Sequence, residues 1–226
     1  LCRMLGAALQ IPIVTAPVPF DRYVEQLCRG EIDLFGPLMA GANCPSNIRF
    51  SSPLNRMGLS VLMRHRSTSG LAPLPPPASL HDLINRDYAI AVLKDTRGHL
   101  FCRTELRRSE ESLIVCSSDE EAIERLLLKG ISRPAHLMVT NSVFAGQQAA
   151  LQPDGLYTLF NADGSTLDMC DNSLAIRPDW AHLHPEIDGA LVATLARGGF
   201  AERFRTLAQA IGVGQLEAID YSDTGS

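Results

Sequence analysis

The six cysteines and six histidines are the side chains of this 226-residue chain best suited to act as nucleophiles, bases or metal ligands. A cysteine hydrolase would need a thiol such as that of Cys44 with a histidine held beside it, yet no local motif pairs the two. His182 and His184 stand two residues apart, which does not place both rings on one face of a helix, although a loop could bring both to a metal. The sequence therefore predicts no catalytic residues and no enzyme of these kinds.

The spacing of the cysteines also argues against a metal or a nucleotide cofactor. No two cysteines form a CxxC pair, and no cysteine–histidine cluster has the spacing of a zinc site. The chain contains neither a P-loop nor GxGxxG, and Gly212-x-Gly214 is an isolated pair. We therefore predict no metal and no cofactor. An even number of cysteines permits disulfides, and reduced buried thiols are an equal alternative. Cys102 and Cys116 are the first pair to test, because a helix and the strand after it often pack together.

The charge and hydropathy of the chain limit its partners. The net charge is −5, the pI is about 5.7, and acidic and basic residues are interspersed. Phosphate binding favours a basic surface, so nucleic acid is not an expected partner. No segment approaches the roughly 20 consecutive apolar residues that a membrane helix needs, so these residues are not expected to span a membrane.

Short apolar runs alternate with helical patterns along the chain. Strand–helix–strand alternation predicts an α/β fold with doubly wound, mostly parallel sheets flanked by helices. A Pro- and Ser-rich stretch over 67–79 interrupts the series and predicts an extended loop, either a connector or a surface excursion. The fresh series that follows it suggests two lobes. Ligands of such sheets bind at the carboxyl ends of strands, which points to the loops after Gly36, Leu93 and Thr140. Strands are predicted at 11–15, 32–36, 58–63, 88–92, 112–116, 137–140 and 174–177, and helices at 20–29, 80–85, 98–108, 117–129, 142–150, 186–197 and 199–211.

Several short motifs occur in a recognisable order. A helix-to-strand step at 9–13 is followed by LxxGxxD at 27–33, FSxP at 50–53 and SLxDL at 79–83. A strand and turn at 89–96, a helix at 120–130, a return strand within 171–179 and two final helices complete the series. This order resembles the extracellular solute-binding family 3 of type 2 periplasmic binding proteins.

The resemblance implies two lobes joined by hinge strands, with 1–64 and 172–226 in the first lobe and 65–171 in the second. It implies a protein that captures a small solute between the lobes, for an ABC-type transporter or as the sensor domain of a membrane receptor. The expected partners are a small-molecule ligand and a membrane permease or receptor signalling domain. The expected location is the periplasm or another extracytoplasmic space, with the signal segment outside these residues. In the family a central strand precedes the opening helix, so we expect such a strand upstream of Leu1.

The family's hallmark ligand charges are missing from the matching positions. Cys44 stands where the family has the arginine that clamps a ligand carboxylate. Thr140 and Asn141 stand near the position of the aspartate that holds the ligand ammonium. A zwitterion needs opposite charges to offset its desolvation, so an ordinary α-amino acid is not the expected ligand.

The family's carboxylate-binding turn matches Asp95-Thr96-Arg97 at a helix start. Thr96 keeps the hydroxyl and Arg97 favours an anion, while Asp95 disfavours one; alternatively, Asp95 only caps the helix. Met39 and Gly41 match the loop that presents backbone groups to the ligand, although Met39 could equally be a packing residue.

Two other functions stay open. One is a dehydratase-like enzyme for a cyclic carboxylate with Asp95 as general acid. The other is a degenerate signalling module that binds no ligand.

Overall fold

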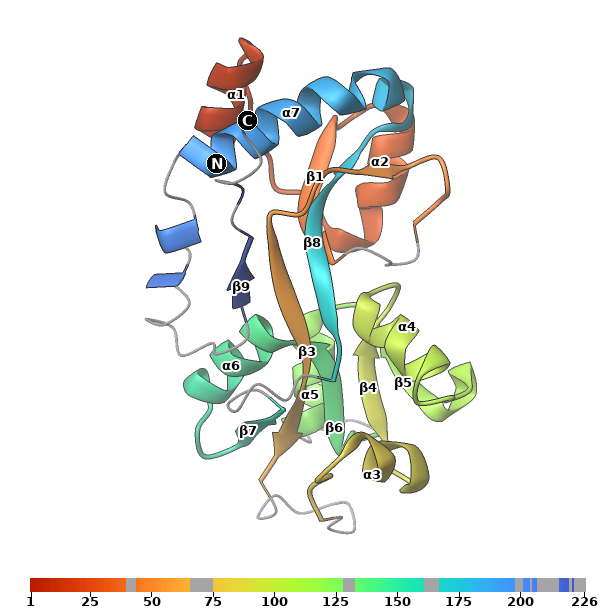
Figure 1. Cartoon of the computed structure of the whole chain (residues 1–226). Coiled ribbons are helices and arrows are strands. Elements are labelled where there is room, and N and C mark those ends of the chain that lie inside the picture. Colours follow the sequence, from red (N-terminus) through yellow and green to blue (C-terminus); the bar gives the residue numbers. More distant parts are fainter. Residues whose placement is uncertain are drawn as a thin grey trace. The chain divides into compact units, whose positions relative to one another are not determined.

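The computed structural model shows an α/β protein that folds into two compact units (Figure 1). Unit 1 contains Leu1–Arg56, Asp171–Ala208 and Glu217–Ser226, and unit 2 contains Met57–Cys170 and Gln209–Leu216. The structure describes residues 1–39, 44–65, 75–127, 133–160, 167–197, 201–203, 205–206, 216–219 and 221.

Three strands contain residues of both units: β3 (Asn55–Arg64), β8 (Met169–Ile176) and the short β9 (Leu216–Ala218). The division expected from the sequence places 57–64 with the first lobe, whereas the compact units place them with the second. The long β3 is buried along nearly all of its length, from Gly58 to Arg64.

Unit 1 is built around β8. The strands β1 (Leu34–Met39) and β2 (Arg49–Phe50) both pair with β8, and both pairings are antiparallel. The helix predicted over 20–29 forms as a 3-10 turn, η1 (Phe20–Arg22), followed by α2 (Tyr23–Arg29). Gly30 ends α2 with a φ of 70°, a left-handed conformation that favours glycine. The remaining elements of this unit are α1 (Cys2–Leu9), η3 (Pro178–Leu183) and α7 (His184–Arg197).

The strand predicted at 11–15 is wrong. Residues 12–19 have no regular structure, and the side chain of Val14 is 88% exposed. The N–H of Ile11 donates instead to the carbonyl of Gly6, which closes the end of α1. Pro12 has no N–H to donate to a ladder, so this apolar run is poorly suited to pair with a neighbouring strand.

Unit 2 contains a mixed sheet. The strand β4 (Ile90–Leu93) pairs in parallel with β5 (Leu113–Cys116) and β6 (Leu137–Asn141). The strand β3 pairs antiparallel with β6 and β7 (Leu156–Leu159). A mostly parallel sheet was predicted, and the difference arises because crossover helices join only β4, β5 and β6. The helical elements described in this unit are α3 (Leu80–Asn85), α4 (Arg97–Thr104), η2 (Glu110–Ser112), α5 (Asp119–Leu127) and α6 (Ser142–Leu151).

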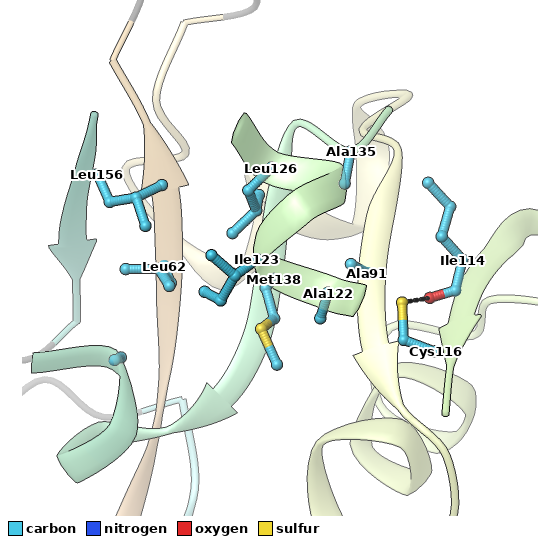
Figure 2. Packing of buried hydrophobic residues seen from close by; sticks show 11 residues of the cluster. Leu62, Ala91, Ile114, Cys116, Ala122, Ile123, Leu126, Ala135, Met138 and Leu156 are labelled. Carbon is cyan, nitrogen blue, oxygen red and sulfur yellow. Dashed lines mark hydrogen bonds between the residues drawn. The ribbon is translucent and has the colours of Figure 1, made fainter. Parts of the chain in front are cut away.

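A buried hydrophobic cluster fixes the sheet of unit 2 against α5. Figure 2 shows Ile123 and Leu126 of α5 gathered with Leu62 of β3, Ala91 of β4 and Met138 of β6. The spacing of Ile123 and Leu126 puts both on one face of the helix, and burial of each side chain contributes about 1.5–3 kcal/mol. This packing holds β4 and β6 in place against α5.

The cysteines form no disulfides. All six are free, and Cys102 and Cys116 are buried thiols. The predicted helix end at Gly130, most of the Pro-rich loop and much of the last helix lie outside the described residues.

Candidate functional site

The carboxyl ends of β4 and β6 lie at one edge of the sheet in unit 2, because the two strands are parallel neighbours. The helices α4 and α6 begin at this edge, and the close approach of α4 to β6 depends on Gly98. A Cβ atom at Gly98 would lie only 2.6 Å from the carbonyl oxygen of Val139. Five of the eight residues predicted from the sequence therefore share this edge: Asp95, Thr96, Arg97, Thr140 and Asn141.

Thr96 and Asn141 cap the two helices. The Thr96 hydroxyl accepts the N–H of His99 at 3.3 Å and donates its own hydrogen to the carbonyl of Leu93 at 2.7 Å. The Asn141 side-chain oxygen accepts the N–H of Phe144 at 2.8 Å. Caps of this kind satisfy backbone donors that have no partner inside the helix. The cap of α4 is thus Thr96, and the alternative that Asp95 serves as this cap is wrong.

Asp95 lies in the turn before α4 with a φ of 58°, a left-handed conformation that is uncommon outside glycine. Its backbone N–H donates to Nδ1 of His99 at 3.2 Å. Because Nδ1 accepts this bond, the neutral ring carries its proton on Nε2, which lies 3.1 Å from the Glu110 carboxylate. The His99 side chain is 8% exposed, so it fixes the turn from inside.

Arg97 is paired within unit 2. Its Nε and Nη2 atoms donate to the same oxygen of Asp168, at 3.0 and 2.5 Å, and the Cys170 thiol donates to that oxygen at 3.3 Å. The side chains of Arg97 and Asp168 are 23% and 26% exposed. Burial alone would lower the pKa of Arg97, but its contacts with Asp168 and Cys170 raise that pKa above its ordinary value. Arg97 is therefore a fixed cation at the start of α4.

Thr140 is buried in β6 opposite Ser60 of β3. Because Thr140 is buried within the β3–β6 pairing, its side chain is suited to packing that holds the carboxyl end of β6 in place.

The predicted residues of unit 1 are held by packing. The Cys44 sulfur lies 3.0 Å from the Tyr23 hydroxyl in a cluster with Leu27 and Ile48. Burial raises the pKa of the Cys44 thiol, which lowers its thiolate fraction and works against nucleophilic reactivity. Met39 is half-buried at the end of β1, and Gly41 lies outside the described residues.

Unit 1 also contains an open pocket of about 550 Å³. Arg49 and Phe50 of β2 line it together with His184, whose Nε2 lies 2.8 Å from the carbonyl oxygen of Phe50. None of the predicted residues lines this pocket. Its walls are completed by Ile48, Ala181 and Pro185.

Two residues of the site were missed in the sequence. Asp168 stands 71 positions from Arg97 and carries no motif, so only the fold reveals the pair. His99 could have been found, because it stands three residues after the cap Thr96, where a side chain can reach back to the turn.

In the part of the chain that the structure describes, no group of three or more His, Cys, Asp or Glu side chains is arranged to hold a metal ion. None of the described helices is long and apolar enough to cross a membrane.

No family model and no curated protein matches the chain. Among solved structures it is similar to the arginine-, lysine-, histidine-binding protein ArtJ from the thermophilic bacterium Geobacillus stearothermophilus, with a TM-score of 0.71 and 16% identity over 90% of this chain and 81% of ArtJ. It is also similar to the ligand-binding core of GluR0 in complex with L-glutamate, with a TM-score of 0.67 and 15% identity over 88% and 83% of the two chains.

A third similar structure is the ancestral amino acid-binding protein AncCDT-1, a precursor of cyclohexadienyl dehydratase. Its TM-score is 0.67 and its identity 17%, over 91% of this chain and 81% of that protein. These likenesses establish that the chain has the type 2 periplasmic binding protein fold, as its motifs predicted. The similar structures are mostly binding proteins.

Proposed function

We propose that this chain is an extracytoplasmic solute-binding domain that captures a small carboxylate-bearing ligand without transforming it. It would serve an ABC-type transporter or a membrane sensor. The observation that carries the proposal is the partly exposed, permanently charged Arg97 at the start of α4, on the edge where α6 also begins. The ligands named for ArtJ and GluR0 all carry a carboxylate, which fits this choice of ligand class.

The first turn of α4 supplies the donors for such a group. The first N–H groups of a helix lack partners inside it and face an anion together with the positive end of the helix dipole. In α4 the N–H of His99 is already bonded to the Thr96 hydroxyl, so the donors for a ligand are those that precede it. The Arg97 guanidinium adds a charge-assisted hydrogen bond. Thr96 has already committed its hydrogen to Leu93, so its role is to hold the turn in shape. Asp95, Thr140 and Asn141 complete the proposed site, while Met39, Gly41 and Cys44 stay predictions.

A thermal-shift screen with organic acids, amino acids, polyamines and sugars tests the ligand class. A ligand at 100 times its Kd stabilises the native state by about 2.7 kcal/mol, so a true ligand raises the Tm. We expect hits among carboxylates, with affinities that fall about tenfold or more in Arg97→Gln, since a hydrogen bond to a charged group contributes about 1.5–3 kcal/mol.

Arg125→Gln is the matched control. Arg125 also pairs with a carboxylate, that of Glu121, and is 21% exposed, but it lies on α5. Equal losses in both variants would contradict the proposed site. Turnover of a hit would favour the dehydratase-like enzyme, and no response to any solute would favour the ligand-free signalling module.

A further inference from the structure

The contact between Arg97 and Asp168 points to a role for Asp168 that goes beyond folding. We infer that Asp168 is an internal competitor for the ligand carboxylate and thereby sets which carboxylates the site accepts. This inference rests on the proposed function, because it concerns the same cation. A ligand must displace Asp168 from Arg97, or bind beside its negative charge.

The geometry of the pair leaves it open to exchange. A guanidinium binds a carboxylate best when two nitrogens meet two oxygens in parallel. Here Nε and Nη2 of Arg97 converge on a single oxygen of Asp168, and the thiol of Cys170 reaches the same atom. About a quarter of each charged side chain is exposed, so an incoming carboxylate can approach the Arg97 guanidinium from solvent.

When a ligand carboxylate replaces that of Asp168, the number and kind of hydrogen bonds made by Arg97 change little. The ligand would form the hydrogen bonds that Asp168 gives up, and the displaced Asp168 would remain close by as a like charge. Like charges placed together at a binding surface oppose binding, which acts against any ligand that offers only a carboxylate. Ligands that also bind elsewhere on the edge overcome this cost, so Asp168 selects against simple carboxylates.

The backbone of Asp168 is held independently of its side chain. Its carbonyl accepts the N–H of Leu59 at 2.8 Å, and the next residue begins β8. Asp168→Asn therefore removes the negative charge without removing the backbone hydrogen bond that positions residue 168. The substitution thus tests the effect of the charge alone.

The test is a calorimetric titration of succinate and acetate into the wild-type chain, Asp168→Asn and the double variant Arg97→Gln/Asp168→Asn. We expect Asp168→Asn to bind both acetate and succinate at least roughly tenfold more tightly than the wild type, and the double variant to lose this gain. Glu121→Gln is the matched control, because Glu121 pairs with Arg125 at a comparable exposure but on another helix, α5. Its affinity for succinate should equal that of the wild type.

Unchanged or weaker succinate binding by a folded Asp168→Asn would overturn the inference and leave the pair as a structural contact. Circular dichroism and the melting transition establish that the variant is folded. If the wild type binds a screened carboxylate through Arg97 while Asp168→Asn has no effect, the proposed function stands and the inference fails. If neither chain binds any solute of the screen, both fail.

Discussion

The backbone N–H of Asp95 donates a hydrogen bond to Nδ1 of His99 across 3.2 Å, and the other ring nitrogen lies 3.1 Å from Glu110. The imidazole thus links the turn before α4 to η2. Its counterpart at the amino ends of the strands is His136, whose Nδ1 accepts the N–H of Ala89 at 2.9 Å. Two buried histidines therefore fasten the opposite ends of β4.

Replacement of His99 should affect both stability and binding. His99→Ala removes a buried ring and leaves the partly buried N–H of Asp95 without this acceptor, which costs about 1–3 kcal/mol of unfolding free energy. It should also loosen the turn and weaken a carboxylate hit of the screen. Urea denaturation and titration of that hit measure the two effects.

His136→Ala serves as the comparison for His99→Ala. It should lower stability by a similar amount while the affinity stays close to that of the wild type. Equal loss of affinity in both variants would mean that a general loosening of unit 2 is responsible.

Gly98→Ala should destabilise unit 2, because a Cβ atom would lie 2.6 Å from the carbonyl oxygen of Val139 in β6. Neither backbone can yield without disturbing the edge, and overpacking of this kind costs about 1–3 kcal/mol. The control is Gly189→Ala in α7, where nothing lies within 4 Å of the new methyl group. There the helix propensity of alanine should stabilise the chain by up to about 1 kcal/mol. Thermal denaturation of both variants checks the opposite signs.

Local signals in the sequence predicted many of the elements. The helix predicted at 80–85 has the bounds of α3, and the structure shows that Ser79 caps it by accepting the N–H of Asp82. The end of α2 is also a local feature, because Gly30 alone adopts the left-handed conformation that ends the helix. The strand at 11–15 failed because apolar character does not decide whether a segment finds a partner strand, and Pro12 weakens any ladder.

The candidate site was predictable only where it is local. The turn at Asp95-Thr96-Arg97 lies within a few residues of its helix, so the sequence placed it correctly at a helix start. The partner of Arg97 could not be predicted, because Asp168 reaches it through the pairing of strands that are distant in sequence. Asn141 was assigned from a matching position, and the structure adds its role as the cap of α6.

Glu121 should make the stability of unit 2 depend on pH. The backbone N–H of Ser117 and the guanidinium of Arg125 lower the pKa of Glu121 below its ordinary value. A group with a lowered folded-state pKa contributes stability above its unfolded pKa, and this contribution is lost as the pH falls through the folded-state pKa. Glu121→Gln should therefore be less stable than the wild type at neutral pH, and this difference should shrink as the pH falls below the ordinary glutamate pKa of about 4.3.

Urea denaturation at several pH values measures this difference. A gap between the two chains that stays constant down to low pH would mean that the carboxylate charge of Glu121 is not its source. Arg125→Gln removes the ion-pair partner and should reproduce part of the same pH dependence.

The thiols should divide into two classes of reactivity. Burial raises the pKa of Cys102 to about 12, and burial together with nearby Glu121 raises that of Cys116 to about 11. The thiolate is the reactive form, so these two cysteines should be inert in the native chain. Cys2 and Cys28 are exposed and should react within the same labelling time. Iodoacetamide labelling near pH 8, followed by peptide mass spectrometry, distinguishes the classes, and addition of denaturant should make Cys102 and Cys116 reactive without a reductant. A requirement for reductant would instead indicate a disulfide between Cys102 and Cys116, contrary to the free thiols of the structure.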